Sequence, residues 1–300
     1  MKTLAVCGAT ASGKTGFAVD IAEKIGGEVV SADCMLVYKG LDIGTAKPTR
    51  EEMRGIVHHM IDVAQPTQNY SVSEYAADAE QALQDMAKRE VPAVICGGTG
   101  FYIQSLLFER GLGGAPADEK IRREYEAIVR EKGNSYLHSL LKEVDAESAE
   151  KLHPNDVKRV VRALEIYRLT GRKKSEQKDG FVPKRDYIAV AFDYPRQELY
   201  ERIERRVDDM LAAGLVDEVE GLYRSGIDEH YQCMQGIGYK EVLEYLKNNI
   251  SYSTMSDMIK QNTRNYAKRQ ITFFKKLPNL RWLTPGKDNC DTVLRWMNEN

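Results

Sequence analysis

Short, largely apolar runs alternate with amphipathic segments through the first hundred residues. Three of these runs, Thr3–Cys7, Glu28–Ser31 and Ala93–Cys96, have the length of buried strands. After the first run, apolar residues recur every four positions as far as Ile25, and a second helical pattern follows a Ser-x-x-Glu capping sequence at Ser71. Because strands that alternate with helices usually pair in parallel, the pattern predicts an α/β fold with a parallel sheet flanked by helices.

A different pattern begins after the Gly-rich segment Glu109–Pro116. From there to a strand predicted at Tyr187–Asp193 the chain shows helical spacing only, at Lys120–Glu131, Ser135–Leu141, Ala146–Leu152 and Asp156–Leu169. An all-helical stretch bounded by strands indicates an insertion. The sequence therefore predicts an α/β core, residues 1–114 and 186–300, and an inserted all-helical domain, residues 115–185.

The end of the chain is again mostly helical. The predicted helices are Arg196–Ala213, Leu215–Tyr223, Tyr239–Lys247 and Ser253–Lys276, and Arg281–Leu283 is predicted as a closing strand. The loop Gln177–Arg185 combines Gly, Pro and mixed charges, so we expect it to be the most mobile connection.

The most specific motif lies between the first strand and the first helix. Its residues are Gly8, Ala9, Thr10, Ala11, Ser12, Gly13, Lys14 and Thr15, which fit the phosphate-binding pattern G-x-x-x-x-G-K-[ST]. Backbone N–H groups of such a loop converge on a phosphate chain, Lys14 adds a positive charge, and the Thr15 hydroxyl can reach a Mg²⁺ ion. The motif predicts a polyphosphorylated ligand on a P-loop NTPase-like sheet.

Two more turns are expected beside this loop. Asp33 follows the second predicted strand, and Gly97–Gly100, which contains Thr99, follows the third. Because the carboxyl ends of parallel strands line the ligand crevice, both turns should share an edge with Lys14. Asp33 could then act as a general base or support Mg²⁺, and Thr99 could contact a phosphate or a base edge. The alternative for Asp33 is a carboxylate in a solvated turn.

The basic residues are clustered, although the net charge is only −2. No Asp or Glu occurs from Met258 to Arg281, where Lys260, Arg264, Lys268 and Lys275 recur on one helical face. A second basic stretch runs from Val157 to Lys178. Basic faces with few acids favour binding to nucleic acid, whereas a face that only confers solubility would carry mixed charges.

Arg202 and Arg206 lie four residues apart and would share one helical face. Guanidinium pairs suit pyrophosphate because they are planar and always charged. Their spacing fits an exposed face paired with Glu201 and Asp209 at least as well.

Composition argues against several other classes. The five cysteines, Cys7, Cys34, Cys96, Cys233 and Cys290, are scattered without a C-x-x-C pair, which argues against a zinc site or a disulfide framework. The His58–His59 pair has no Cys or carboxylate cluster beside it, so we do not predict that it binds metal. No apolar run approaches the roughly 18 residues of a membrane span. No signal peptide is recognisable, so we expect a cytoplasmic protein.

Taken together, the motifs resemble those of the tRNA dimethylallyltransferase (IPP transferase) family over nearly the whole chain. The matching segments are Gly8–Thr15, Ser31–Tyr38, Asp42–Pro48, Gly97–Tyr102, Asn155–Glu165, Gln235–Glu241 and Thr263–Gln270. The resemblance implies transfer of a dimethylallyl group from dimethylallyl diphosphate to N6 of the adenosine 3′-adjacent to the anticodon (position 37) of tRNA. It also implies Mg²⁺ as cofactor, the tRNA anticodon stem-loop as partner, no membrane or obligate protein partner, and a monomer.

The resemblance also implies roles for individual residues. Asp33 would take the N6 proton, Thr99 would position it or the diphosphate, and Lys14 would stabilise the departing diphosphate. Arg202 and Arg206 would join the phosphate loop as diphosphate-binding residues, and Thr15 would hold Mg²⁺. The implied tRNA-binding residues are Asp33, Cys34, Met35, Leu36, Thr99, Arg122, Lys158, Arg159, Val160, Val161, Arg162, Gln235, Gly238, Lys240, Arg264, Lys268 and Arg269.

The sequence departs from the usual family pattern at Cys34 and Leu36, where a Ser and a Gln are common. Three other functions fit parts of the sequence. A small-molecule kinase could use ATP at the same loop, with Asp33 activating a hydroxyl group. A prenyltransferase could modify a free adenine nucleotide instead of RNA. A nucleotide-switched RNA-binding protein would use the loop without chemistry.

Overall fold

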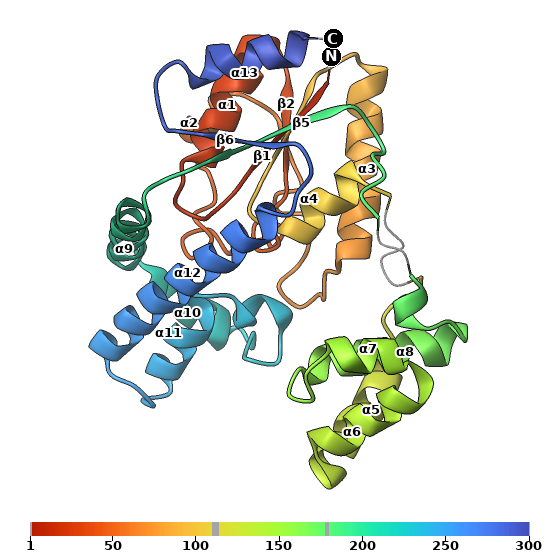
Figure 1. Cartoon of the computed structure of the whole chain (residues 1–300). Coiled ribbons are helices and arrows are strands. Elements are labelled where there is room, and N and C mark those ends of the chain that lie inside the picture. The colour runs from red at the N-terminus through yellow and green to blue at the C-terminus, as the bar shows by residue number, and fades with distance from the viewer. Residues whose placement is uncertain (1, 110–113, 178–179, 300) are drawn as a thin grey trace. The chain divides into compact units, whose positions relative to one another are not determined.

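The computed structural model describes residues 2–109, 114–177 and 180–299 (Figure 1). The chain divides into two compact units, a large unit of Met1–Phe108 with Pro183–Asn300 and a small unit of Glu109–Val182. Parts of the predicted Gly-rich break and of the predicted mobile loop, residues 110–113 and 178–179, lie outside the described residues. Among the helices that are described, none is long and apolar enough to cross a membrane.

The small unit begins and ends a few residues earlier than the predicted insertion. Phe108 pairs with Pro183 in an isolated antiparallel bridge, and the Lys184 N–H donates to the Leu107 carbonyl at 2.9 Å. Phe108 is fully buried in the main core. These contacts keep the segment after Pro183 with the large unit, although the sequence pattern placed it in the insertion.

The sheet of the large unit is parallel, as predicted. In the described part of the chain, six strands run in the order β3-β2-β4-β1-β5-β6. Their bounds are β1 Thr3–Cys7, β2 Glu28–Ser31, β3 His58–His59, β4 Ala93–Cys96, β5 Tyr187–Phe192 and β6 Leu280–Leu283. The bounds predicted for β1, β2 and β4 are confirmed. β3 was not predicted, because a strand of two residues is too short to show an alternating pattern.

Both faces of the sheet are buried, which explains why its strands are apolar at successive positions. In β1, Ala5 and Cys7 belong to one core, and Leu4 and Val6 belong to the other. On the first face lie α3 and α4, and on the second α1 and α13 (Figure 1). Their bounds are α1 Lys14–Ile25, α3 Val72–Lys88, α4 Gly100–Leu107 and α13 Asn289–Asn298.

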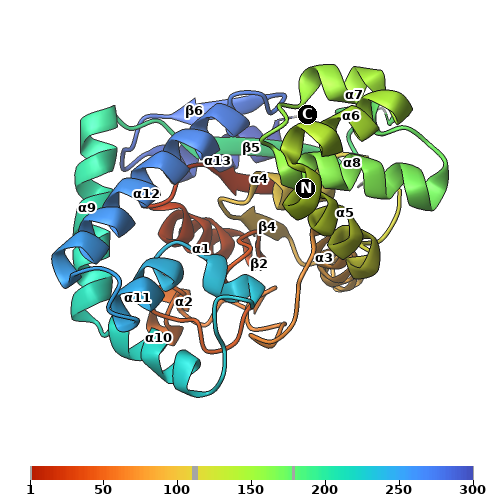
Figure 2. The ribbon, with the colours of Figure 1, turned by 90° about the horizontal axis from the view of Figure 1, so that it is seen from below.

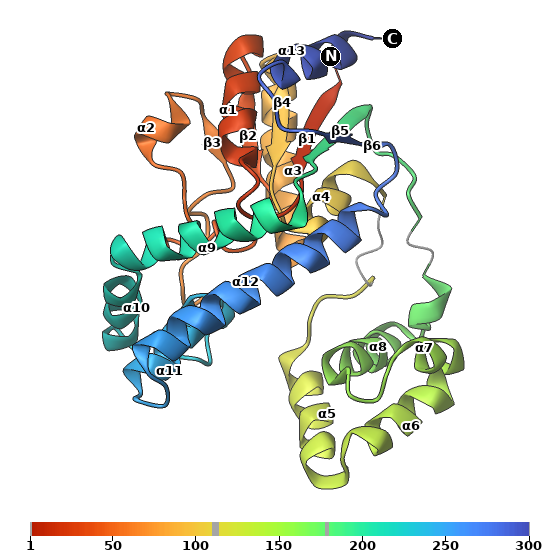
Figure 3. The same cartoon turned by 60° about the vertical axis from the view of Figure 1, so that its left-hand side comes forward.

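The remaining helices of the large unit include four that lie beyond the carboxyl ends of the strands (Figures 1 and 2). Their bounds are α9 Arg196–Ala212, α10 Leu215–Arg224, α11 Tyr239–Leu246 and α12 Tyr252–Phe274, and the short helices are α2 Arg50–Met53 and η2 Gln232–Gln235. α9 and α12 run side by side (Figure 3). Ile203 of α9 and Ala267 of α12 share a small apolar cluster with Ala9. This cluster brings the C-terminal helices against the phosphate loop.

The small unit contains the four predicted helices and has its own core. The bounds are α5 Glu119–Lys132, α6 Asn134–Val144, α7 Ala146–Lys151 and α8 Val157–Thr170, followed by the short helix η1 Lys174–Glu176. The core is formed by Leu137, Leu141, Ala149, Val160, Val161, Ala163 and Leu164.

Glu165 adds a buried polar centre to the small unit. Its side chain is fully buried and accepts hydrogen bonds from the Asp118 N–H at 2.7 Å, Arg122 Nε at 2.9 Å and Arg162 Nη1 at 2.5 Å. Burial alone would raise the pKa of Glu165, but these donors lower it below its ordinary value. The carboxylate therefore ties the start of α5 to α8 while remaining charged.

Glu28 makes a comparable pair at the start of β2, and this pair predicts a pH dependence. Arg89 contacts both carboxylate oxygens at 2.5 and 2.7 Å, and His59 Nε2 lies 2.7 Å from Oε2. The Arg89 hydrogen bonds, opposed by burial and helped by His59, lower the pKa of Glu28 from 4.5 to about 2. A lowered pKa stabilises the fold above the unfolded-state value, and this contribution is lost as pH falls toward 2.

We therefore expect Glu28→Gln to lower the free energy of unfolding by about 2 kcal/mol at pH 7, a value reduced for the half-exposed Arg89. The difference from wild type should shrink between pH 4.5 and pH 2 in urea titrations. Asp257→Asn, which alters an exposed carboxylate on α12, is the matched control. A difference that does not vary with pH would contradict the assignment.

Candidate functional site

The phosphate loop forms a compact turn between β1 and α1. Gly13, the N-cap of α1, has a φ of +82°, a left-handed conformation that favours glycine. Ser12 Oγ donates to the Ala9 carbonyl at 2.8 Å, and Lys14 Nζ donates to the same carbonyl at 2.5 Å. The turn is therefore held by its own side chains at the N-terminus of α1, where helix N–H groups attract anions.

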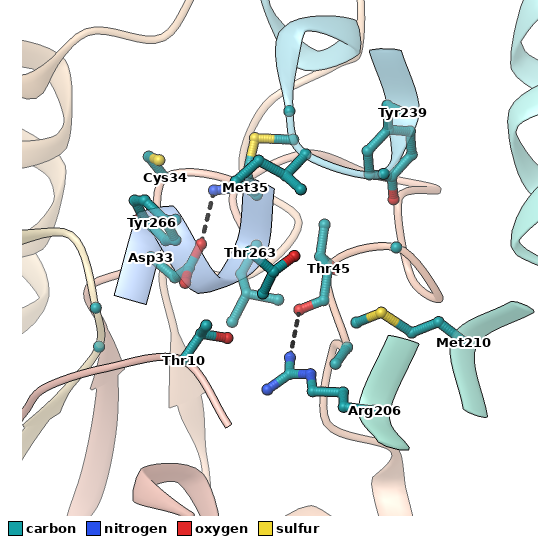
Figure 4. Close-up of a pocket in the computed structure, with 18 of the residues that line it drawn as sticks. Thr10, Asp33, Cys34, Met35, Thr45, Arg206, Met210, Tyr239, Thr263 and Tyr266 are labelled. Atoms are coloured by element: carbon teal, nitrogen blue, oxygen red, sulfur yellow. Dashed lines mark hydrogen bonds between the residues drawn. The ribbon is translucent and has the colours of Figure 1, made fainter. Parts of the chain in front are cut away.

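Two arginines of α9 approach the site from the C-terminal helices. Arg202 Nε donates to the Ala11 carbonyl at 2.9 Å, and Arg206 Nη2 contacts the Thr45 carbonyl at 3.4 Å (Figure 4). Neither arginine makes an ion pair with Glu201 or Asp209 in the described part of the chain. The exposed, salt-bridged face that their spacing also allowed is therefore not formed.

The site has an excess of positive charge. Burial lowers the pKa of Lys14 from its ordinary 10.5, and nearby Arg206 lowers it further, whereas Cys96 and Asp33 raise it. Burial also lowers the pKa of Arg206, again with Asp33 acting in the opposite direction. Two desolvated cations thus face one carboxylate, and a bound polyanion would restore the charge balance.

Asp33 occupies the turn after β2 (Figure 4). Its Oδ1 accepts the Met35 N–H at 2.9 Å, and no described residue bonds to Oδ2. Thr99, the N-cap of α4, accepts the Cys34 N–H through Oγ1 at 3.0 Å. Thr99 therefore fixes the turn that carries Asp33. Because Oδ2 of Asp33 has no partner among the described residues, that oxygen can bind a ligand.

The cysteines near Asp33 are not prepared for reaction. Burial, helped by the Asp33 charge, raises the pKa of Cys34 to about 11. Burial likewise raises the pKa of Cys96 to about 11. Both thiols stay protonated near neutral pH, and a protonated thiol is a weak nucleophile and a poor metal ligand.

Lys14, Asp33 and Arg206 line one cavity of about 460 Å³ inside the large unit. The predicted site residues in its wall are Thr10, Lys14, Thr15, Asp33, Cys34, Met35, Leu36, Arg206, Gln235, Gly238, Lys240 and Arg269. The predicted residues of the large unit outside its wall are Gly8, Ala9, Ala11, Ser12, Gly13, Thr99, Arg202, Arg264 and Lys268. Thr45, Thr263 and Tyr266 also belong to the wall (Figure 4), as does Gln270.

Glu218 of α10 organises one side of this wall and was missed by the sequence analysis. Its Oε2 accepts the N–H groups of Asp42 and Ile43 at 2.8 and 2.7 Å, and its Oε1 accepts the Gly44 N–H at 3.1 Å. The Tyr239 hydroxyl donates to Oε1 at 2.7 Å. One carboxylate thus holds the segment that presents Thr45 to Arg206. No single-sequence signal links it to a loop that lies so far away in the chain.

Gln270 of α12 was also missed as a site residue. It is 5 % exposed, its Oε1 accepts the Thr10 N–H at 2.8 Å, and its Nε2 donates to the Gly98 carbonyl at 2.9 Å. A signal was present, because Gln270 shares the spacing of the buried residues Ala267 and Phe274. A polar residue on the apolar stripe of a helix needs a buried partner.

The basic face predicted for α12 is partly neutralised, contrary to expectation. Lys260 Nζ lies 2.6 Å from Asp208 Oδ1, and Arg264 pairs with Glu204. Both acids belong to α9, which packs along α12, so a search of the α12 segment alone could not find them. Lys268 is exposed and lies over the Tyr200 ring at 5.8 Å. Binding of RNA by this face stays a prediction.

The residues of α8 predicted to contact tRNA lie on two different faces of the helix. Val160 and Val161 are 0 % and 6 % exposed and pack in the core of the small unit, and their contact with RNA stays a prediction. They form the apolar stripe of an amphipathic helix, whereas Lys158 and Arg159 are exposed. Arg122 and Arg162 bind Glu165 but keep 34 % and 29 % of their side chains exposed.

Comparison with known proteins agrees with this architecture. Residues 36–277 match the model of the family described as IPP transferase. The chain belongs to the IPP transferase family. A tRNA dimethylallyltransferase of Acetivibrio thermocellus is 42 % identical over 292 residues, which cover 96 % of this chain and 93 % of that protein. Another, of Caldanaerobacter subterraneus, is 44 % identical over 282 residues, with 92 % and 90 % covered.

Solved structures related to this IPP transferase family member have the same fold. The tRNA isopentenylpyrophosphate transferase of Bacillus halodurans matches with a TM-score of 0.75 and 38 % identity, covering 99 % of this chain and 95 % of that one. A eukaryotic dimethylallyltransferase described as acting on tRNA matches with a TM-score of 0.81 and 29 % identity, covering 99 % and 77 %. The predicted fold class, a P-loop-like parallel sheet flanked by helices, is confirmed.

The Glu218 contacts predict a specific loss of stability. Glu218→Ala removes the acceptor of three backbone N–H groups, so the free energy of unfolding should fall by about 3 kcal/mol in urea titrations. Glu220→Ala, on the same helix, removes only a surface pair with Arg224 and should cost less than about 0.5 kcal/mol. Equal losses in the two variants would show that the loop does not depend on Glu218.

Proposed function

We propose that this member of the IPP transferase family transfers a dimethylallyl group from dimethylallyl diphosphate to N6 of adenosine 37, 3′-adjacent to the anticodon, in tRNAs. Diphosphate is released. The proposal rests on one observation above all: a single cavity joins the phosphate loop and two desolvated cations, Lys14 and Arg206, to the carboxylate of Asp33. An anionic leaving group and a proton acceptor are the two requirements of this reaction.

The cations serve the departing diphosphate. As the carbon–oxygen bond of the donor breaks, negative charge grows on the bridging oxygen. Lys14, Arg206 and the N–H groups at the start of α1 are fixed around that region and stabilise this charge without reorganising. Arg202, bonded to the Ala11 carbonyl, supports the loop from outside the cavity.

Asp33 serves the acceptor. The exocyclic amine of adenine is a weak nucleophile because its lone pair is delocalised into the ring. As the new carbon–nitrogen bond forms, the N6 proton passes to the carboxylate oxygen that has no partner among the described residues. Thr99 acts indirectly, because its hydroxyl fixes the Cys34 N–H beside Asp33.

The acceptor base must leave its stack to enter this cavity. Gln235, Gly238, Lys240 and Arg269 line the cavity and would contact the extruded nucleotide. Further contacts to the anticodon stem-loop are proposed for Arg264 and Lys268 of α12 and for Arg122, Lys158, Arg159 and Arg162 of the small unit. Met35 and the apolar Cys34 and Leu36 would meet the base by packing.

Mg²⁺ fits the donor set of this cavity. The Thr15 hydroxyl and the Asp33 carboxylate line it together, and hard oxygen ligands are those that Mg²⁺ prefers. Thr15 is the residue proposed to hold the ion. When bound, Mg²⁺ would neutralise charge on the diphosphate oxygens. A cytoplasmic location and action as a monomer stay predictions.

The identity of the acceptor molecule distinguishes the proposed reaction from the alternative reactions. Purified enzyme with dimethylallyl diphosphate and Mg²⁺ should prenylate unmodified tRNA, measured by mass spectrometry of the digested nucleosides. AMP should react more slowly by orders of magnitude, and a mixture of ATP with a small alcohol should give no phosphorylated alcohol. Prenylation of AMP as fast as tRNA would contradict the RNA acceptor.

Asp33→Asn tests the proposed base. The amide keeps the acceptor for the Met35 N–H but cannot take the N6 proton, so kcat should fall by about 10²–10⁴ while diphosphate affinity is retained. Asp209→Asn, on an exposed part of α9, is the matched control. Weak diphosphate binding with normal turnover at saturation would assign Asp33 to binding instead.

A further inference from the structure

The side chain of Gln270 forms hydrogen bonds to two turns at once. Its carboxamide accepts from the Thr10 N–H in the phosphate loop and donates to the Gly98 carbonyl after β4. The two turns follow β1 and β4, which are neighbours in the sheet. Gln270 itself lies on α12, more than 170 positions later in the chain than either turn.

The chemistry of the two turns suits a carboxamide at this position. A backbone N–H needs an acceptor and a backbone C=O needs a donor, and the carboxamide of Gln270 offers both on one planar group at any pH. The fit is close, because a Cβ on Gly98 would lie 2.2 Å from Gln270 Nε2. The turn can therefore approach α12 only without a side chain at Gly98.

The hydrogen bond to Gly98 holds a turn that packs beside the proposed base, Asp33. Gly97 packs on the end of β2, where a Cβ would lie 2.1 Å from the Ala32 carbonyl oxygen. Asp33 is the next residue after Ala32. The other hydrogen bond, from the Thr10 N–H, holds the loop that is proposed to bind the diphosphate. A displacement at either hydrogen bond therefore changes the spacing between donor loop and base.

We infer that Gln270 is a positioning residue that fixes the phosphate loop relative to the Asp33 turn and thereby sets the affinity for the diphosphate. The inference rests on the proposed function for the identity of the donor. Gln270 acts through Thr10 and Gly98, so its loss should impair binding of the donor and leave the tRNA contacts in place.

The test uses the full-length enzyme and inorganic pyrophosphate with Mg²⁺, titrated by calorimetry without tRNA. Gln270→Met keeps the size of the side chain but removes both hydrogen bonds. We expect pyrophosphate affinity to fall about tenfold, which corresponds to about 1.4 kcal/mol. The KM for dimethylallyl diphosphate should rise by the same factor, with the KM for tRNA unchanged. Gln81→Met, on the exposed face of α3, is the matched control and should match wild type.

Gln270→Glu separates positioning from a general loss of packing. Its ionised carboxylate can still accept from the Thr10 N–H but repels the Gly98 carbonyl, whereas its protonated form can donate to that carbonyl. The affinity for pyrophosphate, taken as a ratio to wild type at each pH, should therefore recover as pH falls. For Gln270→Met the same ratio should not vary with pH.

Wild-type pyrophosphate affinity in Gln270→Met, or a pH-independent ratio in Gln270→Glu, would overturn the inference. Both readouts are made without RNA and without prenyl transfer. Failure of the wild-type enzyme to modify tRNA would therefore contradict the proposed function alone.

Discussion

A parallel sheet with both faces buried confines polar chemistry to one edge, and the candidate site depends on this constraint. β1, β2 and β4 cannot carry functional groups on their faces, because apolar helices cover them. Lys14 and Asp33 therefore follow the carboxyl ends of β1 and β2, and Thr99 follows β4. The sheet order makes these strands neighbours, so Lys14 and Asp33 line one cavity and Thr99 fixes the turn that carries Asp33.

The charge balance of the cavity follows from the same confinement. Lys14 and Arg206 lose hydration there and make no ion pair with any described acid, while Asp33 supplies one negative charge in the same wall. Desolvation of unpaired cations costs free energy that a bound anion can return. A ligand that carries several negative charges thus stabilises the site it enters, and in the proposed reaction the release of diphosphate would restore the unbalanced state.

Local patterns predicted the elements well, whereas partners that lie far apart in sequence could not be predicted. Bounds of β1, β2 and β4 were found because buried strands read as short apolar runs. The burial of Val160 and Val161 was not predicted because a basic stretch was treated as a unit, although helical spacing separates its apolar and charged faces. The acid that pairs with Arg264 lies sixty residues earlier, on α9. Gln270 and Glu218 bind backbone N–H and C=O groups. Because nearly every residue carries these groups, the sequence does not indicate which ones the two side chains bind.

These long-range hydrogen bonds also show which parts of the chain form one functional unit. Glu218 holds the segment that begins at Asp42, and Gln270 holds Thr10, so helices from the C-terminal part complete loops of the N-terminal part. Neither part would keep the cavity alone. The small unit differs, because its core and the Glu165 centre are made from its own residues. The small unit therefore divides the sequence of the large unit between α4 and β5, but the contacts that build the site lie within the large unit.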